Sequence, residues 1–257
     1  MVLDYEIKTV DASNLDETGF FCYMSKRKEP GYIQKREWLR KRFDEGMRIK
    51  ILHEKGGRDV AFIEYIPGEY AWRAVDAPGY MVIHCLWVVG KGKGKGYGSR
   101  LIQECINDSR AERMLGVAML TSDRTWLASK KIFLRNGFRE VGQAPPSFQL
   151  MVSSFKDEAT PTLPMDWDKR AKNFGDGLTV IRTPQCPYIE NGARDILAFA
   201  KDKGIPAKSI ELKNAKEVQQ RSPSAYGVFG TVLDGSLLAY QYLEKRDFDK
   251  LLLQRVR

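Results

Sequence analysis

A glycine- and lysine-rich loop, KGKGKGYG at residues 91–98, separates an apolar run from a helical pattern that begins near Ser99. The apolar run, residues 81–89, predicts a buried strand, so the loop joins a strand to a helix. Four glycines in eight residues allow left-handed backbone and the close approach of a ligand. Three lysines and the amides at the start of the helix favour an anion. We therefore predict a cradle for a pyrophosphate group at this loop.

The spacing of the glycines excludes two common phosphate-binding motifs. A P-loop requires G-x-x-x-x-G-K-[ST], and no serine or threonine follows a lysine in this loop. A dinucleotide-binding fold requires G-x-G-x-x-G, and Gly92, Gly94 and Gly96 are spaced differently. The spacing alone leaves open a solvated glycine-lysine hairpin loop as the alternative.

The residues that follow the loop alternate between helical and strand patterns. Apolar positions in 99–114 repeat at helical spacing, 116–120 is a short apolar strand, and 127–136 is a second helix that ends at Gly137. Phe138 opens the next strand. In front of the loop, 80–89 reads as the central buried strand.

Two segments carry a resemblance to a known family. Residues 93–98 resemble the [Q/R]-x-x-G-x-[G/A] signature of the GNAT N-acetyltransferase superfamily, with Lys93 at the usual Gln or Arg position. Residues 128–138, ASKKIFLRNGF, resemble the family's A-x-x-x-x-[Y]-x-x-x-G-F ending. The resemblance covers residues 3–155. It implies a GNAT fold of the α/β (α+β) class, with a mixed central sheet flanked by helices. It also implies acetyl-CoA as the acyl-donor cosubstrate and no metal.

The resemblance also implies how acetyl-CoA binds. The pantetheine arm is expected to pair with the open edge of the central strand, and the pyrophosphate to accept hydrogen bonds from the amides that follow it. The implied cofactor-binding residues are Leu86, Trp87, Val88, Val89, Lys93, Gly94, Lys95, Gly96, Tyr97, Gly98, Ser99 and Phe133. The amine of the acceptor, a small molecule or a peptide, would attack the thioester directly.

The acid and base of the family have no direct counterpart. Phe133 stands where many members have a tyrosine that protonates the thiolate, and Val82 stands where some have a glutamate base. Three side chains are candidates instead: His84, Glu64 and Asp123. Imidazole has a near-neutral reference pKa, so His84 could accept the amine proton directly or through water. Each also has a structural interpretation, as core residues or, for Asp123, as a helix cap. Cys85 is expected to point to the face opposite His84.

Other elements of the first 155 residues follow from periodicity and turn residues. We expect strands at 5–10, 48–54 and 59–66, the last two joined as a hairpin by Lys55-Gly56-Gly57, and helices at 17–28 and 33–45.

The last 80 residues predict a smaller α/β domain. The expected order is strand 178–182, helix 193–203, strand 209–212, helix 215–220, strands 226–233 and 236–243 joined by Asp234-Gly235, and helix 247–253. This layout resembles thioredoxin, and Cys186-Pro187-Tyr188-Ile189 resembles the glutaredoxin C-P-Y-C site without its second cysteine. Ser222-Pro223 would carry that fold's cis-proline. The whole chain resembles acetyltransferases with a C-terminal YoaP-like domain.

The predicted domains are therefore 1–155, a linker at 156–177, and a thioredoxin-like domain at 178–257. Cys186 precedes a helix, which favours its thiolate, so a redox role and an inherited structural role both stay open. Two other functions stay open: a non-catalytic acyl-CoA sensor and a thiol-dependent redox protein centred on Cys186.

Composition sets the remaining expectations. A chain of 257 residues with 43% hydrophobic content can bury two ordinary cores. The four cysteines are scattered without metal-ligand spacing, which favours reduced thiols. The net charge of +9 is spread almost evenly, so nucleic acid is not an expected partner. No run is long and apolar enough for a membrane span, and nothing near the N-terminus has the apolar h-region of a signal peptide. We expect a cytoplasmic protein, with a homodimer among the open oligomeric states.

Overall fold

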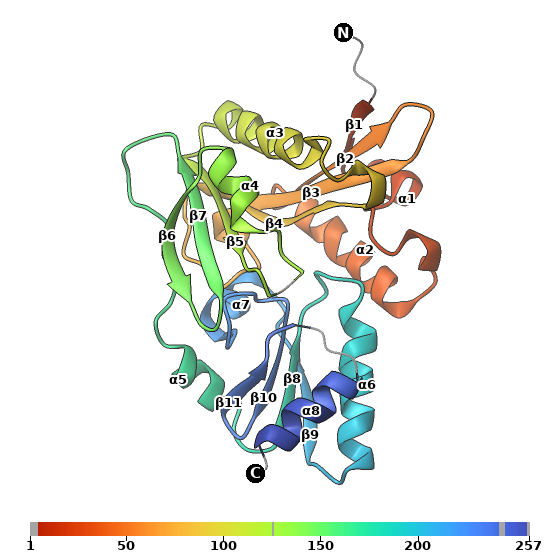
Figure 1. Ribbon diagram of the computed structural model, residues 1–257, viewed down its shortest axis with the longest axis vertical. Coiled ribbons are helices and arrows are strands. Elements are labelled where there is room, and N and C mark those ends of the chain that lie inside the picture. Colours follow the sequence, from red (N-terminus) through yellow and green to blue (C-terminus); the bar gives the residue numbers. More distant parts are fainter. Residues whose placement is uncertain (1–4, 125, 242–244, 256–257) are drawn as a thin grey trace. The chain divides into compact units, whose positions relative to one another are not determined.

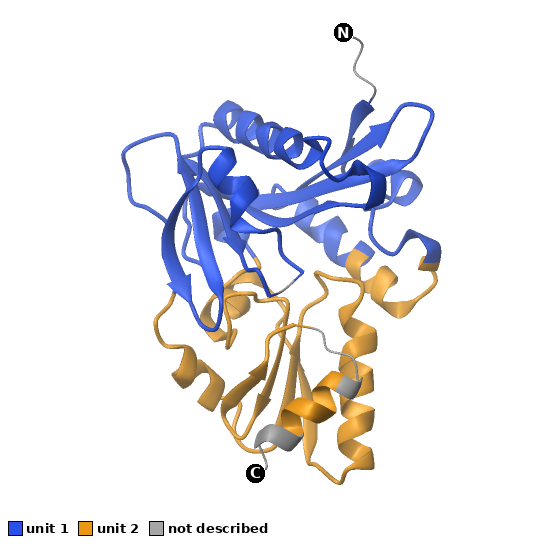
Figure 2. Cartoon of the chain, viewed as in Figure 1, with its two compact units in different colours: residues 1–25, 36–71, 75–163 blue, residues 26–35, 72–74, 164–257 orange. Residues whose placement is uncertain are grey.

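The computed structural model describes residues 5–124, 126–241 and 245–255. Contacts within it divide the chain into two compact units (Figure 2). The first comprises residues 1–25, 36–71 and 75–163, and the second comprises 26–35, 72–74 and 164–257. The domain boundaries from the sequence stay a prediction.

The first unit is built on a mixed sheet with the order β1-β2-β3-β4-β5-β7-β6 (Figure 1). Its strands are β1 (Tyr5–Val10), β2 (Arg48–Glu54), β3 (Asp59–Pro67), β4 (Tyr80–Val88), β5 (Gly116–Thr121), β6 (Arg139–Ala144) and β7 (Phe148–Ser154). Within this sheet β4 and β5 pair in parallel and the other described pairs are antiparallel, which confirms the expected mixed sheet.

The first unit contains the helices α1 (Leu15–Thr18), α3 (Tyr97–Ala111) and α4 (Lys130–Arg135), with 3-10 turns η2 (Gly68–Tyr70) and η3 (Gly90–Gly92). The helix α2 (Pro30–Phe43) and the 3-10 turn η1 (Met24–Lys26) have residues in both units. On α3 the apolar side chains Leu101, Ile102, Cys105 and Ile106 are buried, as their helical spacing predicted.

The predicted helix at 17–28 is wrong. α1 stops at Thr18, because Gly19, Phe21 and Tyr23 all have left-handed backbone, with φ of 74°, 74° and 61°. A residue in that conformation cannot continue a right-handed helix, and nothing in a periodicity argument reveals it.

The second unit holds a four-stranded sheet with the order β11-β10-β8-β9. Its elements are α5 (Trp167–Lys172), β8 (Leu178–Arg182), α6 (Ile189–Asp202), β9 (Ala207–Glu211), α7 (Ala215–Arg221), β10 (Phe229–Leu233), β11 (Ser236–Ala239) and α8 (Lys245–Arg255). β8 and β9 are parallel, and the other two pairs are antiparallel.

The turn between β10 and β11 has the predicted chemistry. Asp234 and Gly235 have φ of 47° and 71°, the left-handed pair that a type I′ turn needs. β11 is shorter than the predicted strand 236–243, whose end lies outside the described residues. The expected cis bond at Ser222-Pro223 is wrong, since the cis bond in the described part of the chain is Pro145-Pro146.

Candidate active site

The central strand β4 has one edge that opens part of the way along its length. It pairs with β5 through Tyr80–Ile83, matched to Gly116–Met119. Beyond Ile83, β4 continues to Val88 against β3, and no described strand pairs with its other edge. An open edge offers backbone donors and acceptors to an extended ligand.

A β-bulge lies at the point where β4 leaves β5. Glu64 of β3 pairs with Cys85, and Tyr65 pairs with Ile83, so His84 is the extra residue on β4. Such a bulge interrupts the strict alternation of side chains and re-aims them. The predicted opposition of His84 and Cys85, which assumed strict alternation, therefore loses its basis.

His84 and Glu64 come together at this bulge. Nδ1 of His84 lies 3.5 Å from Oε1 of Glu64, and the two residues are 1% and 3% exposed. The Trp38 ring of α2 stacks on the imidazole, with ring centroids 6.2 Å apart and an interplanar angle of 29°. Two of the three predicted acid-base residues thus form one buried pair, which is consistent with both their core and their catalytic interpretations.

Asp123 is separate from this pair. It is exposed in the loop after β5, and no contact joins it to His84 or Glu64. Its predicted role as a helix cap is wrong, because α4 begins at Lys130 with Ser129 as the N-cap, whose Oγ accepts from the Lys131 amide.

The glycine-lysine loop follows the open edge directly. Gly94 and Gly96 have φ of 81° and 79°, and a Cβ at either position would meet no atom within 4 Å. Left-handed backbone with open space above it allows a ligand to approach the main chain closely. Gly96 is also the N-cap of α3.

The other two glycines serve packing. A Cβ on Gly98 would lie 2.7 Å from Cδ1 of Ile132, so α4 packs directly on the first turn of α3. Gly92 is buried, and a Cβ there would meet Val60 and Val88 at 3.2 Å. The same four-glycine run thus shapes both the surface of the loop and its support.

Some amides of the loop already have acceptors. The Lys93 and Lys95 amides donate to the carbonyls of Gly90 and Gly92, at 3.2 and 3.4 Å. The first α-helical bond of α3 runs from Arg100 to Gly96, so the amides of Gly98 and Ser99 belong to the first turn, where helices bind anions. Of the amides at 93–99 that the resemblance assigned to the pyrophosphate, those of Lys93 and Lys95 are thus already hydrogen-bonded within the protein.

The remaining predicted cofactor residues differ in exposure. Leu86 is buried and Trp87 is 41% exposed, while Val88, the last residue of β4, and Val89, which follows it, are half-buried. Phe133 of α4 is fully buried and packs edge-to-face on Phe138, with ring centroids 5.2 Å apart.

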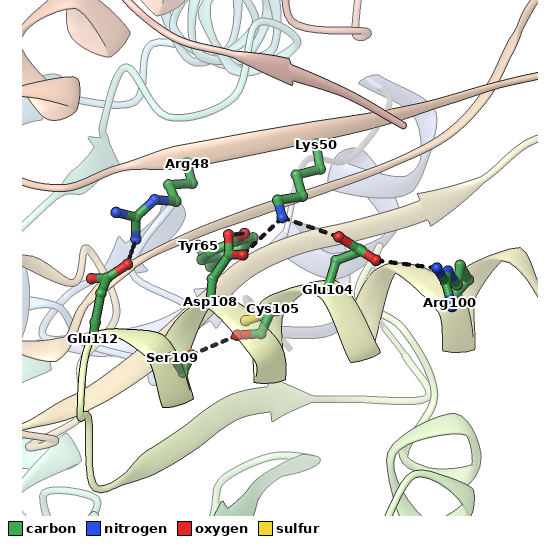
Figure 3. A network of polar contacts seen from close by, with 9 residues as sticks. All are labelled: Arg48, Lys50, Tyr65, Arg100, Glu104, Cys105, Asp108, Ser109 and Glu112. Atoms are coloured by element: carbon green, nitrogen blue, oxygen red, sulfur yellow. Dashed lines mark hydrogen bonds and ion pairs between the residues drawn. The ribbon is translucent and has the colours of Figure 1, made fainter. Parts of the chain in front are cut away.

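A polar network anchors α3 to the sheet (Figure 3). Nζ of Lys50, on β2, lies 3.2 Å from Oε2 of Glu104 and 2.9 Å from Oδ1 of Asp108, both on α3. The Tyr65 hydroxyl, from β3, donates to Oδ2 of Asp108 at 2.5 Å. The Lys50 side chain is 9% exposed. Sequence reasoning missed this network because its members are far apart in the chain.

Burial changes the acid-base chemistry of Tyr65 and Cys105. It raises the pKa of the Tyr65 hydroxyl, with Cys105 and Asp108 acting in the same direction. It also raises the pKa of the Cys105 thiol, which is fully buried. Both groups therefore stay protonated near neutral pH, and the Cys105 side chain is shielded from solvent.

Cys186 lies in the second unit, between β8 and α6. It is half-buried, and Ile189 begins α6 where a glutaredoxin site would have its second cysteine. The preceding Gln185 is buried and donates through Nε2 to Oγ1 of Thr183 and to the Gly227 carbonyl, at 3.0 and 3.1 Å. The redox role of Cys186 stays a prediction.

Two features are absent from the described residues. No group of three or more His, Cys, Asp or Glu side chains is arranged to hold a metal ion. Within the same ranges, no helix combines the length and the apolar character that a membrane crossing requires.

Comparisons with known proteins identify the family. A model described as the Acetyltransferase (GNAT) family matches residues 13–138. The uncharacterized N-acetyltransferase YoaP of Bacillus subtilis (strain 168) is 32% identical over 246 residues, covering 95% of this chain and 96% of the relative. The chain belongs to the GNAT acetyltransferase family and is an acyltransferase.

Solved structures with similar folds share much less sequence. The ribosomal-protein-S5-alanine acetyltransferase of Vibrio fischeri is 12% identical, with a TM-score of 0.45, over 62% of this chain and 98% of its own. The PaiA N-acetyltransferase of Thermoplasma acidophilum, solved in complex with coenzyme A, is 13% identical, with a TM-score of 0.42, over 60% of this chain and 100% of its own.

Proposed function

We propose that this protein transfers the acetyl group of acetyl-CoA to a primary amine by direct attack of the amine on the thioester. The observation that carries the proposal is the continuous arrangement of an open strand edge, a bulge and the glycine-lysine loop along residues 84–99. Family membership supplies the reaction class. The acceptor, a small molecule or a peptide, is set by side chains around the site, and the fold does not specify it.

The residues present suit acetyl-CoA as the donor substrate. The open edge at 86–89 can pair with the amides of an extended pantetheine arm. Open space above Gly94 and Gly96 leaves room for a pyrophosphate near the start of α3, where the helix dipole favours negative charge. Bound there, acetyl-CoA supplies an activated thioester, and the chain's part is to hold it and orient the amine.

We assign proton removal from the amine to the His84–Glu64 pair. A neutral imidazole can accept a proton, and a carboxylate 3.5 Å away stabilises the protonated ring. Because His84 is 1% exposed, the proton reaches it through water. Phe133 has no hydroxyl and is buried, so it cannot protonate the departing thiolate, which solvent can do instead.

A screen for release of CoA tests the proposal. Wild-type protein with acetyl-CoA and a panel of polyamines, amino acids, aminoglycosides and amino-terminal peptides is expected to release CoA steadily with at least one class of amine. Mass spectrometry of that amine should show one added acetyl group. Saturable binding of acetyl-CoA with no turnover across the panel would contradict catalysis and support the acyl-CoA sensor.

For the second unit we infer a thioredoxin-like fold that shapes substrate choice or contacts a partner. The element order β8-α6-β9-α7-β10-β11-α8 and the sheet order β11-β10-β8-β9 support this inference.

The four cysteines, none in a disulfide, support a cytoplasmic location. A homodimer stays a prediction.

A further inference from the structure

One carboxylate of the β2–β3 hairpin, that of Glu54, is hydrogen-bonded to the glycine-lysine loop. Oε1 of Glu54, the last residue of β2, accepts from Nζ of Lys95 at 2.7 Å and from the hydroxyl of Tyr97 at 2.8 Å. These two partners flank Gly96, the left-handed N-cap of α3. The Glu54 side chain therefore connects the two residues on either side of Gly96.

Glu54 itself is firmly placed. Its amide donates to the Arg58 carbonyl at 3.1 Å, and its own carbonyl accepts from the Gly57 amide at 2.9 Å, which fixes it in the hairpin turn. The hydrogen bond from Lys95 first, and then the one from Tyr97, holds the pKa of the Glu54 carboxyl below its ordinary value. Glu54 is accordingly ionised at neutral pH.

The partners of Glu54 have further contacts that make the bridge stiff. Tyr97 is 8% exposed and packs edge-to-face on Tyr5 of β1, with ring centroids 5.6 Å apart. Nζ of Lys95 lies 5.7 Å from the centroid of the Tyr97 ring. The Lys95 side chain stays 49% exposed, so it is held by the carboxylate at the surface of the loop.

This arrangement has a cost for binding an anion. A carboxylate beside the loop repels a pyrophosphate and neutralises Lys95, one of the three lysines of 91–98. A loop that served by charge alone would bind acetyl-CoA better without Glu54. A loop that binds through its backbone geometry needs Glu54, because ordering a flexible glycine-rich segment on binding costs conformational entropy.

We propose that Glu54 is a positioning residue, which fixes the glycine-lysine loop in its ligand-ready conformation by bridging Lys95 and Tyr97. The proposal rests on the proposed function, since it assigns the loop to the pyrophosphate of acetyl-CoA. Glu54 lies outside the loop, and it raises the affinity for an anion although its own charge is negative.

Calorimetric titration of acetyl-CoA into wild type, Glu54→Ala and Glu54→Gln tests it. Alanine removes the bridge, so the Kd is expected to rise roughly tenfold, the effect of losing a hydrogen bond to a charged group. Glutamine keeps an acceptor oxygen without the charge, so binding should be as tight as wild type or tighter. Tighter binding by both variants, or unchanged binding by Glu54→Ala, would overturn the proposal.

Two controls separate positioning from general destabilisation and from failure of the proposed function. Glu140→Ala also removes a lysine-paired carboxylate, bonded to Lys130 at 3.0 Å, and should leave the Kd unchanged. Acetyl-pantetheine, which lacks the pyrophosphate, should compete equally well in wild type and Glu54→Ala. Equal losses for both donors would overturn the proposal, whereas absence of acetyl-CoA binding by wild type would overturn the proposed function as well.

Discussion

Replacing His84 by glutamine is expected to lower kcat for acetyl transfer about 100-fold or more, because general base catalysis contributes 10²–10⁴-fold. Glutamine has a similar volume, which limits the cavity at a site where His84 is 1% exposed. The KM for acetyl-CoA should change little, since the imidazole is assigned no contact with the donor. Steady-state rates with the amine found in the screen provide the measurement.

The chain offers a matched control for this substitution. It has two histidines, and the other, His53, pairs with Asp59 at 2.7 Å on the β2–β3 hairpin. His53→Gln should leave kcat unchanged. Wild-type kcat should fall in acid, because a protonated imidazole cannot accept a second proton, and His84→Gln should lose that fall. A kcat within about threefold of wild type would place the base elsewhere and make His84 a core residue.

Lys50→Met is expected to reduce the free energy of unfolding of the first unit by ~3 kcal/mol. Methionine keeps an aliphatic stem but leaves Glu104 and Asp108 facing each other without their shared cation. The estimate lies at the low end for a broken buried ion pair, because the two carboxylate side chains are 22% and 25% exposed.

The thiol of Cys105 allows unfolding of the first unit to be measured by itself. This is needed because a chain of two units need not unfold in one step. This buried thiol should react with iodoacetamide only after the first unit opens, so alkylation along a urea series measures that unit. Lys130→Met removes the exposed ion pair with Glu140 and should cost less than about 1 kcal/mol. Equal losses for the two variants would show that the network around Lys50 adds nothing beyond a surface pair.

The features that sequence could predict are those with local causes. Gly94 and Gly96 take the left-handed backbone that the glycine-rich run predicted, and Asp234-Gly235 encodes its own turn. The hairpin at Lys55-Gly56-Gly57 and the buried face of α3 follow from the same kind of local pattern.

The features that sequence missed depend on contacts between distant residues. Lys50 and Asp108 are both charged and read as surface positions until the fold brings them together. Glu54 gave no signal, because its partners lie in a loop 41 and 43 positions away. The bulge at His84 arises from the register between β3 and β4, which no single strand pattern contains.

If the loop at 91–98 binds the pyrophosphate of acetyl-CoA, a carboxylate placed in the loop should prevent binding. Calorimetric titration of acetyl-CoA into wild type, Gly96→Glu and Gly175→Glu tests this. Gly175 has a φ of 76° and open space like Gly96 but lies in the second unit, so it carries the same strain and charge elsewhere. Saturable binding by wild type and Gly175→Glu, lost in Gly96→Glu, is the predicted result. Equal binding by all three proteins, or none by wild type, would contradict the claim.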